Sequence, residues 1–366
     1  MNLQKHFEDV QDFRVQGRCW HELSDILIIV LLGTLADCHD FPEMEDYAKD
    51  KEAFLRTELG LQLRSGIPSE DTLGRVLRFL KPAEVEKSLR SACQEVLATI
   101  AQKHIRLDGK ELRGTIPPGK KHAQVQVLSA WIAEESISFG QLQIAEKSNE
   151  ITAIPQLLDA LDCAGSIISI DAIACQKTIV EKIVARQADY VIALKENQGA
   201  LYEQLSEYVL AHRPHLPQVV QRTKDRDRGE QRTVYVAPIP PFLEAAHEWK
   251  SLHTVVLVES IRCIGDQQTH SKRFYISSLT DEPPARYAGL IRGHWGIENG
   301  LHWHLDLTFR EDDSRVRKGN GPLNLNIFRK FSLFLLTQEP SRISLKRKRK
   351  KAARDDGFML ELLKSA

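Results

Sequence analysis

The sequence lacks closely spaced cysteines, long apolar runs and an excess of charge of either sign. Its six cysteines are scattered without a CxxC pair, a pattern that argues against a thiolate zinc site and favours reduced thiols in a cytoplasmic protein. The most apolar run, residues 26–32, is far shorter than the roughly 20 residues that cross a bilayer. We therefore expect no membrane association.

The charges balance, with 50 lysines and arginines against 50 aspartates and glutamates. A nucleic-acid-binding protein of zero net charge must gather its positive charge into patches. Net charge therefore neither supports nor excludes DNA as a partner. The length of 366 residues exceeds that of one typical domain and predicts two or three structural units.

The first hundred residues carry the patterns of helices. Dense apolar residues over 23–35 predict a buried helix. Over 67–80, Ser69 is a candidate N-cap, the apolar residues follow at helical spacing, and Pro82 ends the element. Pairs of short helices of this kind can bind DNA, but they more often pack on a neighbour.

From His104 the pattern changes to strands and helices in alternation. The expected order is three strands, helix, strand, helix, strand, at 104–108, 125–133, 136–145, 150–161, 166–171, 177–186 and 189–195. This is the order of a ribonuclease H-like (RNase H-like) core, in which the first and fourth strands lie side by side. The predicted fold class is therefore α/β.

The remainder of the chain is less regular. Strand-like runs and a charged stretch, 222–232, predict a β-rich insertion at about 200–285. A helix is expected from about Ala285 through Phe309, followed by an apolar helix over 324–336. The basic run KRKRKK, 346–351, predicts a mobile tail that assists non-specific DNA binding.

Three acids form a candidate metal site. Asp108 and Asp171 each follow an apolar run at the predicted end of a strand, and Glu298 lies on the later helix. Two carboxylates at one sheet edge repel each other unless a cation lies between them, and oxygen ligands favour Mg²⁺ or Mn²⁺ over zinc. The alternative is that a lone aspartate after a strand simply forms a turn or helix cap.

The predicted helix around Glu298 leaves two further alternatives open. His294, Glu298, His302 and Asp306 recur every four residues, so the face could bind zinc or, as we favour, place histidines against phosphates while Glu298 binds Mg²⁺. Trp295 and Trp303 could stack on an extruded base or belong to the core.

A cationic loop follows this helix. Arg315, Arg317 and Lys318 stand beside two glycines, a composition suited to phosphate contact. A solvated surface loop is the alternative.

Several motifs resemble those of the DDE transposases of the H-repeat-associated insertion-sequence group. They are IRLDGKELRG (105–114), IISIDAIACQ (167–176), YVIALKENQGALYE (190–203), YISSL (275–279), RGHWGIENGLHWHLDLTFREDDSR (292–315) and RKGNGPLNLNIFRK (317–330). Residues 9–80 resemble the helical domain associated with these transposases. The resemblance covers nearly the whole chain in one order.

The resemblance implies a metal-binding triad of Asp108, Asp171 and Glu298 that holds Mg²⁺ or Mn²⁺, expected as two ions. The residues expected to contact DNA are Lys110, Arg113, Lys195, Asn197, Gln198, Arg292, His294, Trp295, His302, Arg315, Arg317, Lys318 and Arg329. Related families carry Tyr, Arg and Lys around the glutamate, where this chain has Ile291, His294 and Leu305. The stretch DRGEQR, 227–232, likewise replaces an expected His-Gly-Arg.

The expected domains are an N-terminal helical domain (1–98), an RNase H-like DDE catalytic domain (99–340) and a basic C-terminal tail (341–366). The expected function is that of a bacterial insertion-sequence transposase acting on double-stranded DNA, cytoplasmic or nucleoid-associated, as a homodimer in the synaptic complex. One alternative is a metal-dependent nuclease that cuts without joining. Another is an inactive transposase-derived protein that binds DNA.

Overall fold

The computed structural model describes residues 3–15, 17–94, 101–116, 125–145, 148–225 and 228–364. The chain divides into two compact units, which are considered separately. Unit 1 comprises Met1–Ala98, Gly109–Ser148 and Glu298–Ala366, and unit 2 comprises Thr99–Asp108 and Asn149–Ile297. This division cuts across the three expected domains, whose boundaries stay a prediction.

Unit 2 contains the first part of strand β1 (His104–Leu112) and the strands that follow it in space. The neighbours run in the order β1-β4-β5-β9-β8-β7-β6. These strands are β4 (Ile167–Ile170), β5 (Asp189–Leu194), β6 (Gln218–Asp225), β7 (Arg228–Pro238), β8 (Thr254–Ile264) and β9 (Gln267–Ser277). β1 and β4 are parallel, as are β4 and β5, whereas β9 runs antiparallel to β5.

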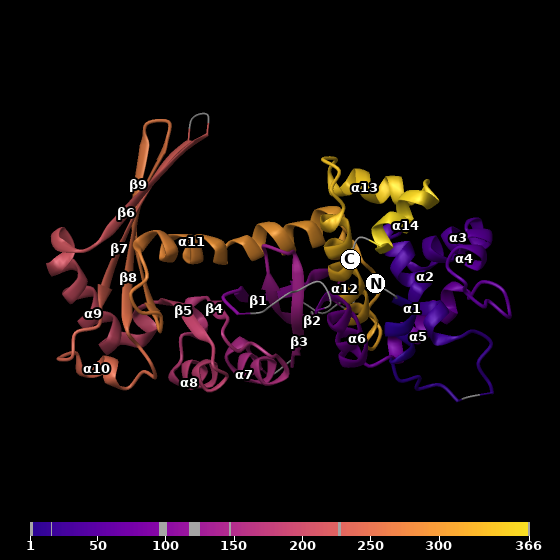
Figure 1. Cartoon of the computed structure of the whole chain (residues 1–366), viewed down its shortest axis with the longest axis horizontal. Helices are drawn as coiled ribbons and strands as arrows, with labels where there is room; N and C mark the ends of the chain where they lie inside the picture. The colour runs from indigo at the N-terminus through magenta and orange to yellow at the C-terminus, as the bar shows by residue number, and fades with distance from the viewer. Residues whose placement is uncertain are drawn as a thin grey trace. The chain divides into compact units, whose positions relative to one another are not determined.

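The helices of unit 2 cover both faces of these strands. They are α7 (Glu150–Ala160), α8 (Lys177–Ala185), α9 (Gly199–His212), α10 (Glu244–His247) and α11 (Pro284–His294), with short 3-10 turns at Ala172–Ala174, Glu196–Gln198 and Arg213–His215. α7 and α8 lie on one face of β4 and β5, and α11 lies on the other (Figure 1). Parallel strands buried between helices explain the almost uninterrupted apolar run of β4.

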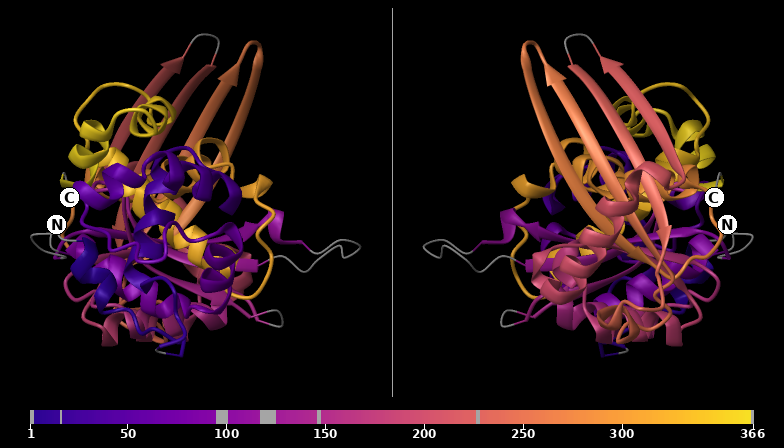
Figure 2. Two further views of the ribbon diagram at one scale, coloured as in Figure 1. Left: turned by 90° about the vertical axis from the view of Figure 1, so that its right-hand side faces the viewer. Right: turned by 90° about the vertical axis from the view of Figure 1, so that its left-hand side faces the viewer.

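The β-rich insertion consists of α9, α10 and the strands β6 to β9. Figure 2 shows these four strands as two long antiparallel hairpins. Of the charged stretch 222–232, residues 222–225 belong to β6 and residues 228–232 to β7, although the composition of the stretch did not predict strands. Because the distal part of this hairpin is solvated, charged side chains can alternate along it without any cost of burial.

Unit 1 contains the N-terminal helices, residues 109–148 and the C-terminal segment from Glu298. Its helices are α1 (Leu3–Glu8), α2 (Leu23–Leu35), α3 (Phe41–Asp50), α4 (Glu52–Thr57), α5 (Glu70–Phe79), α6 (Pro82–Gln94), α12 (Gly321–Gln338), α13 (Leu345–Ala352) and α14 (Asp356–Lys364). Its strands follow the order β3-β2-β1, with β2 (Val125–Ile132) and β3 (Ile137–Ile144) forming a hairpin. The unit also holds short 3-10 turns at Arg113–Thr115 and Glu311–Asp313 and π-helical segments at Glu298–His302 and His304–Thr308.

Helix α12 is the centre of unit 1. Every residue from Gly321 to Leu336 is buried, and the helix packs against α2, α5, α6 and β3. A helix that is buried all round must satisfy its polar side chains internally. Asn324 accordingly donates to the carbonyl oxygens of Leu77 (2.7 Å) and Leu80 (3.0 Å) at the end of α5.

The structure confirms the predicted α/β class: an RNase H-like strand and helix order, a β-rich insertion and a helical N-terminal region. The buried helix predicted at 23–35 is α2, and Ser69 caps α5 by accepting from the Thr72 amide at 3.4 Å. All six cysteines lie in the described residues and are unpaired. Among the described residues, no helix is both long and apolar enough to span a membrane.

Two local predictions are wrong, and a third is confirmed only in part. β1 does not end at Asp108 but continues to Leu112, because Leu112 is buried against Val127 and Leu323 and draws the polar residues 109–111 into the strand. The helix expected from about Ala285 through Phe309 is present in part: α11 ends at His294, Trp295 forms a turn, and residues 296–308 are helical again, with π-helical segments at 298–302 and 304–308. The run 346–351 forms α13 instead of a mobile tail, since two of its cations are buried.

Candidate active site

Asp108 and Asp171 lie level with each other on neighbouring parallel strands of unit 2. The register pairs His104 with Ile167 and Arg106 with Ser169. The same offset places Asp108 opposite Asp171. Asp171 is the first residue after β4, and its backbone is still extended. Adjacent strands are about 5 Å apart, so the two aspartates are neighbours at this end of the pair.

The two aspartates also share one face of the sheet. Side chains alternate along a strand, so Asp108 points as Arg106 does, and Asp171 points as Ser169 does. Arg106 donates to the carbonyl oxygen of Gly293 at 2.6 Å, and the Ser169 hydroxyl contacts His294 at 2.9 Å. The aspartates therefore belong to the face of unit 2 that the C-terminal end of α11 covers.

Hydrogen bonds among three buried or partly buried side chains connect β1, β4 and α11 close to the two aspartates. The Ser169 hydroxyl lies 2.7 Å from Nε2 of His104 on β1 and 2.9 Å from Nδ1 of His294 on α11. A hydroxyl can donate one hydrogen bond and accept another, so it can satisfy both rings. These hydrogen bonds tie β1, β4 and α11 together, with Ser169 two residues before Asp171.

His104 and His294, which both bond to Ser169, are neutral at pH 7. Burial lowers the pKa of His294 to about 4; Asp171 opposes the shift and Arg106 adds to it. Burial, with Arg106 next, lowers the pKa of His104 well below its usual range. His294 is therefore a hydrogen-bonding link in the interior, which corrects the expectation that it contacts phosphate as an exposed side chain.

Close backbone approach explains one glycine of the RGHWG motif. A Cβ on Gly293 would lie 2.9 Å from Nη2 of Arg106 and 3.2 Å from Nδ1 of His104. Any larger residue would push α11 away from these two side chains. The glycine therefore keeps the end of α11 close to β1.

Glu150 is a third acid near Asp171 within unit 2. It begins α7, whose first turn is capped by Asn149. Burial raises the pKa of Glu150, and the negative charge of Asp171 adds to the shift. A carboxyl group whose ionisation is disfavoured by a neighbouring negative charge is typical of a site that a cation would stabilise.

Asn197 and Gln198 support the segment that follows Asp171. The Asn197 amide donates to the carbonyl oxygen of Ala172 at 3.0 Å, and the Gln198 amide donates to that of Cys175 at 2.8 Å. These bonds hold the turn after β4 in place. The polar patch expected to meet DNA therefore contains two positioning side chains, whereas Lys195 beside them is exposed.

Glu298 belongs to unit 1, whereas Asp108 and Asp171 belong to unit 2. The convergence of the three carboxylates consequently stays a prediction. Glu298 itself is exposed and opens a π-helical turn, a local form that is frequent at functional sites. Within the described ranges, no group of three or more His, Cys, Asp or Glu side chains is placed to hold a metal.

The donors that are present suit a hard cation. Asp108, Asp171 and the nearby Glu150 offer only oxygen, which favours Mg²⁺ or Mn²⁺ over zinc. The zinc alternative on the His294 face loses two members, since His294 bonds to Ser169 and Asp306 pairs with Lys110.

Three residues expected to contact DNA are held in the interior of unit 1. Lys110 is only 9% exposed and pairs with Asp306 at 2.6 Å. Arg329 is buried and lies 3.4 Å from Glu311. Burial lowers the pKa of His302 to about 3, so its ring carries no charge at pH 7. Their burial corrects the expectation of direct phosphate contact.

The other candidates for DNA contact lie at the surface. Arg113 and Arg292 are exposed, and the ring of Trp295 is 41% exposed beneath the guanidinium of Arg273. Trp303 is 50% exposed, so neither tryptophan is a core aromatic, and stacking on a base stays a prediction. Arg315, Arg317 and Lys318 line a groove of unit 1.

Sequence reasoning missed Glu150 and the chain His104–Ser169–His294. Glu150 resembled an ordinary first-turn acid of a helix. Ser169 stands two residues before Asp171 inside an apolar strand, and a polar residue there was the available signal of a buried hydrogen bond.

Known proteins resemble this chain over most of its length. A family model described as "Transposase DDE domain" matches residues 101–335, and one described as "DDE_Tnp_1-associated" matches residues 4–91. The "H repeat-associated putative transposase YhhI" of Escherichia coli (strain K12) is 32% identical over 370 residues, covering 99% of this chain and 97% of the relative. The "Putative transposase YncI" of Escherichia coli O157:H7 is 34% identical over 372 residues, covering 100% and 95%. On these matches, the chain belongs to the transposase DDE domain family.

Proposed function

We propose that the protein is a DNA transposase of a bacterial insertion sequence, which cuts the ends of its element and joins them to target DNA. The register that sets Asp108 level with Asp171 in a member of this family carries the proposal. In the cell it would act as a homodimer on double-stranded DNA in the cytoplasm or nucleoid.

The proposed chemistry consists of two phosphoryl transfers. In cleavage, a water oxygen attacks phosphorus at the element end, and the bond to the 3′ oxygen breaks to leave a 3′ hydroxyl and a 5′ phosphate. In joining, that hydroxyl loses its proton and attacks phosphorus in target DNA, whose own 3′ oxygen leaves. No covalent bond to the protein is needed.

Asp108 and Asp171 would hold the divalent cation, with Glu298 as the third ligand. A bound Mg²⁺ or Mn²⁺, expected as two ions, supplies charge stabilisation at the attacking and leaving oxygens. The protein's own part is to keep the carboxylates in place. The chain His104–Ser169–His294 fixes β1, β4 and α11, and Asn197 with Gln198 fixes the turn after Asp171.

The test is Asp108→Asn on a donor plasmid that carries the gene with its flanking DNA. We expect Mg²⁺-dependent cleavage to fall by about a thousandfold or more, because several kcal/mol of charge stabilisation are lost at 1.36 kcal/mol per tenfold. DNA binding and thermal unfolding should change little, since the amide keeps the shape of the carboxylate. Gel analysis of excised and joined products gives the rates.

The matched control is Asp162→Asn, an exposed aspartate of the same unit, which should cleave as the unmodified protein does. Undiminished cleavage by Asp108→Asn would remove Asp108 from the site. Cleavage without any joined product would favour the nuclease alternative. Binding without either product would favour the inactive one.

A further inference from the structure

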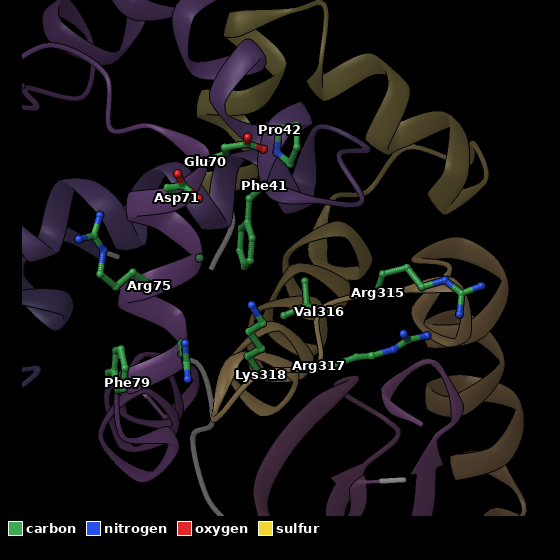
Figure 3. A pocket seen from close by; sticks show the side chains of 12 residues that line it. Phe41, Pro42, Glu70, Asp71, Arg75, Phe79, Arg315, Val316, Arg317 and Lys318 are labelled. Atoms are coloured by element: carbon green, nitrogen blue, oxygen red, sulfur yellow. The ribbon is translucent and has the colours of Figure 1, made fainter. Parts of the chain in front are cut away.

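A groove in unit 1 combines cations from two distant parts of the sequence. It has a volume of about 780 Å³ and is lined by α5, the start of α3 and the loop 315–318. Arg75 and Arg78 come from α5, and Arg315, Arg317 and Lys318 come from the loop. Figure 3 shows Arg75 and Phe79 on one side of the groove and the loop side chains on the other.

Asn320, just after the loop, is fastened to the end of α5 by two hydrogen bonds to backbone carbonyls. The Asn320 amide N–H donates to the carbonyl oxygen of Arg78 at 2.9 Å, and its side chain donates to that of Leu80 at 3.0 Å. Gly319 allows the backbone to come this close to α5. Its φ is +53°, and a Cβ at this position would lie 2.6 Å from the carbonyl oxygen of Arg78. The carbonyls at the end of α5 are thereby satisfied by the loop.

The other side of the loop is held against Gly114. Arg317 donates from Nε to the carbonyl oxygen of Gly114 at 2.8 Å. A Cβ on Gly114 would collide with the carbonyl oxygen of Ser314. The loop is therefore fixed along both edges, and the composite groove is part of the folded unit.

The cations of the groove are not neutralised internally. Arg75, Arg78, Arg315 and Lys318 are exposed, and within the described residues none of these four forms an ion pair. The guanidinium of Arg78 lies 5.0 Å from the centre of the Phe79 ring, which is itself 51% exposed. Exposed cations beside an exposed aromatic ring suit the phosphates and sugars of a nucleic acid.

The charge along the groove is polarised. Glu70 and Asp71 line its end at the start of α5, where acids favour the positive end of the helix dipole. The cations line the end where α5 meets the loop. A polyanion would therefore follow the cationic end and avoid the acidic end.

We propose that this groove binds the phosphate backbone of duplex DNA, with α5 of the N-terminal helical region and the loop 315–318 gripping one DNA segment together. The proposal rests on the proposed function only in that DNA is the ligand. It assigns to α5 a phosphate-binding role and to the Asn320–Arg78 contact the role of joining the two cationic elements.

The test is the salt dependence of binding to a fluorescein-labelled duplex of arbitrary sequence, measured by anisotropy. Each phosphate contact contributes about 0.9 to the slope of log affinity against log salt. The double variant Arg75→Gln with Arg78→Gln should therefore lower the slope by about 1.8. Arg315→Gln with Lys318→Gln should do the same; Arg317 is left unchanged because its bond to Gly114 is structural.

The matched control is Arg64→Gln with Lys87→Gln, which removes two exposed cations of unit 1 outside the groove and should leave the slope unchanged. Arg75→Lys with Arg78→Lys should restore the slope, since phosphate contact requires only the charge. An unchanged slope in the α5 glutamine variant, or equal losses in groove and control variants, would overturn the proposal. Asp108-dependent cleavage would remain in either case, so failure here is distinct from failure of the proposed function.

Discussion

Two basic segments of unit 1 use their cations in opposite ways. The loop 315–318 leaves Arg315 and Lys318 exposed along a groove. The run 346–351 is richer in positive charge, yet it folds as α13 and buries Lys348 and Arg349. The density of charge therefore does not reveal which segment is open to a ligand.

The difference lies in what each segment finds to bind within the protein. Lys348 donates to the carbonyl oxygen of Leu336 (2.9 Å) and to that of Glu339, at the end of α12. Arg349 donates to the carbonyl oxygen of Thr34 (2.8 Å), in the last turn of α2. Helix C-termini leave carbonyls unsatisfied and carry partial negative charge, so cations are stabilised there. In α13 the basic residues act as caps for other helices.

The largest effect on stability is expected from Arg349→Met. Arg349 also pairs with Asp37 at 2.7 Å and lies 4.4 Å from the centre of the Phe309 ring. Removing one member of a fully buried ion pair costs about 3–5 kcal/mol. Because Asp37 is 22% exposed, urea unfolding should show a loss near the lower end of that range. The salt slope of DNA binding should not change below the unfolding transition.

The control is Arg347→Gln, an exposed neighbour on the same helix, for which we expect a change within about 0.5 kcal/mol. If Arg349→Met were as stable as the unmodified protein and bound DNA with a smaller slope, α13 would be a DNA-contacting element. The contrast between the two basic segments would then fail.

Lys330, another cation of unit 1 that the fold buries, should make the free energy of unfolding depend on pH. Lys330 is 2% exposed, and its amine donates to Ser129 (2.7 Å) and to Gln141 (2.6 Å). Burial lowers its pKa to about 7, while Glu311 and Glu86 oppose the shift and Lys110 adds to it. The unfolded chain, with a lysine pKa of about 10.4, holds this proton over a range of pH in which the folded chain has lost it.

The free energy of unfolding should consequently rise with pH between these two pKa values. The slope approaches about 1.4 kcal/mol per pH unit once the folded form is deprotonated, so we expect about 2 kcal/mol between pH 8 and 9.5. Lys330→Met should remove this contribution, whereas Lys318→Gln should retain it. Equal pH dependence in Lys330→Met and the unmodified protein would show that the amine is charged in the folded state.

Much of the fold could be predicted because burial leaves periodic patterns. The apolar residues of α2 and β4 and the cap of α5 predicted those elements. The failures share one cause, which is polar sequence held by tertiary contacts. Residues 109–111 extend β1 because Leu112 is buried beyond them, and α13 forms because helix ends elsewhere accept its cations.

The candidate site was predictable in its acids and not in its supports. The strand order predicted that the strands carrying Asp108 and Asp171 are neighbours, and β1 and β4 are paired in parallel. The role of the two acids stays a prediction. The link from Ser169 to His294 joins residues 125 apart in sequence, which no local pattern encodes. Lys110 and Arg329 were expected at the DNA surface because side-chain type does not reveal a carboxylate partner within the protein.

The smallest effect is expected from Gly319→Ala. This substitution tests whether Gly319 is needed to hold the loop 315–318 against α5 with its cations exposed. Gly319→Ala requires an alanine at φ +53° and places its Cβ 2.6 Å from the carbonyl oxygen of Arg78. Gly60 has φ +68° with nothing within 4 Å of its Cβ position, so Gly60→Ala incurs the backbone strain of about 1–2 kcal/mol without the collision. Gly319→Ala should be less stable than Gly60→Ala by about 1 kcal/mol, the lower end for overpacking. Because the collision parts the loop from α5, its salt slope should also fall, by less than in the α5 glutamine variant. Equal stability and equal slopes in the two alanine variants would mean that the loop carries its cations independently of α5.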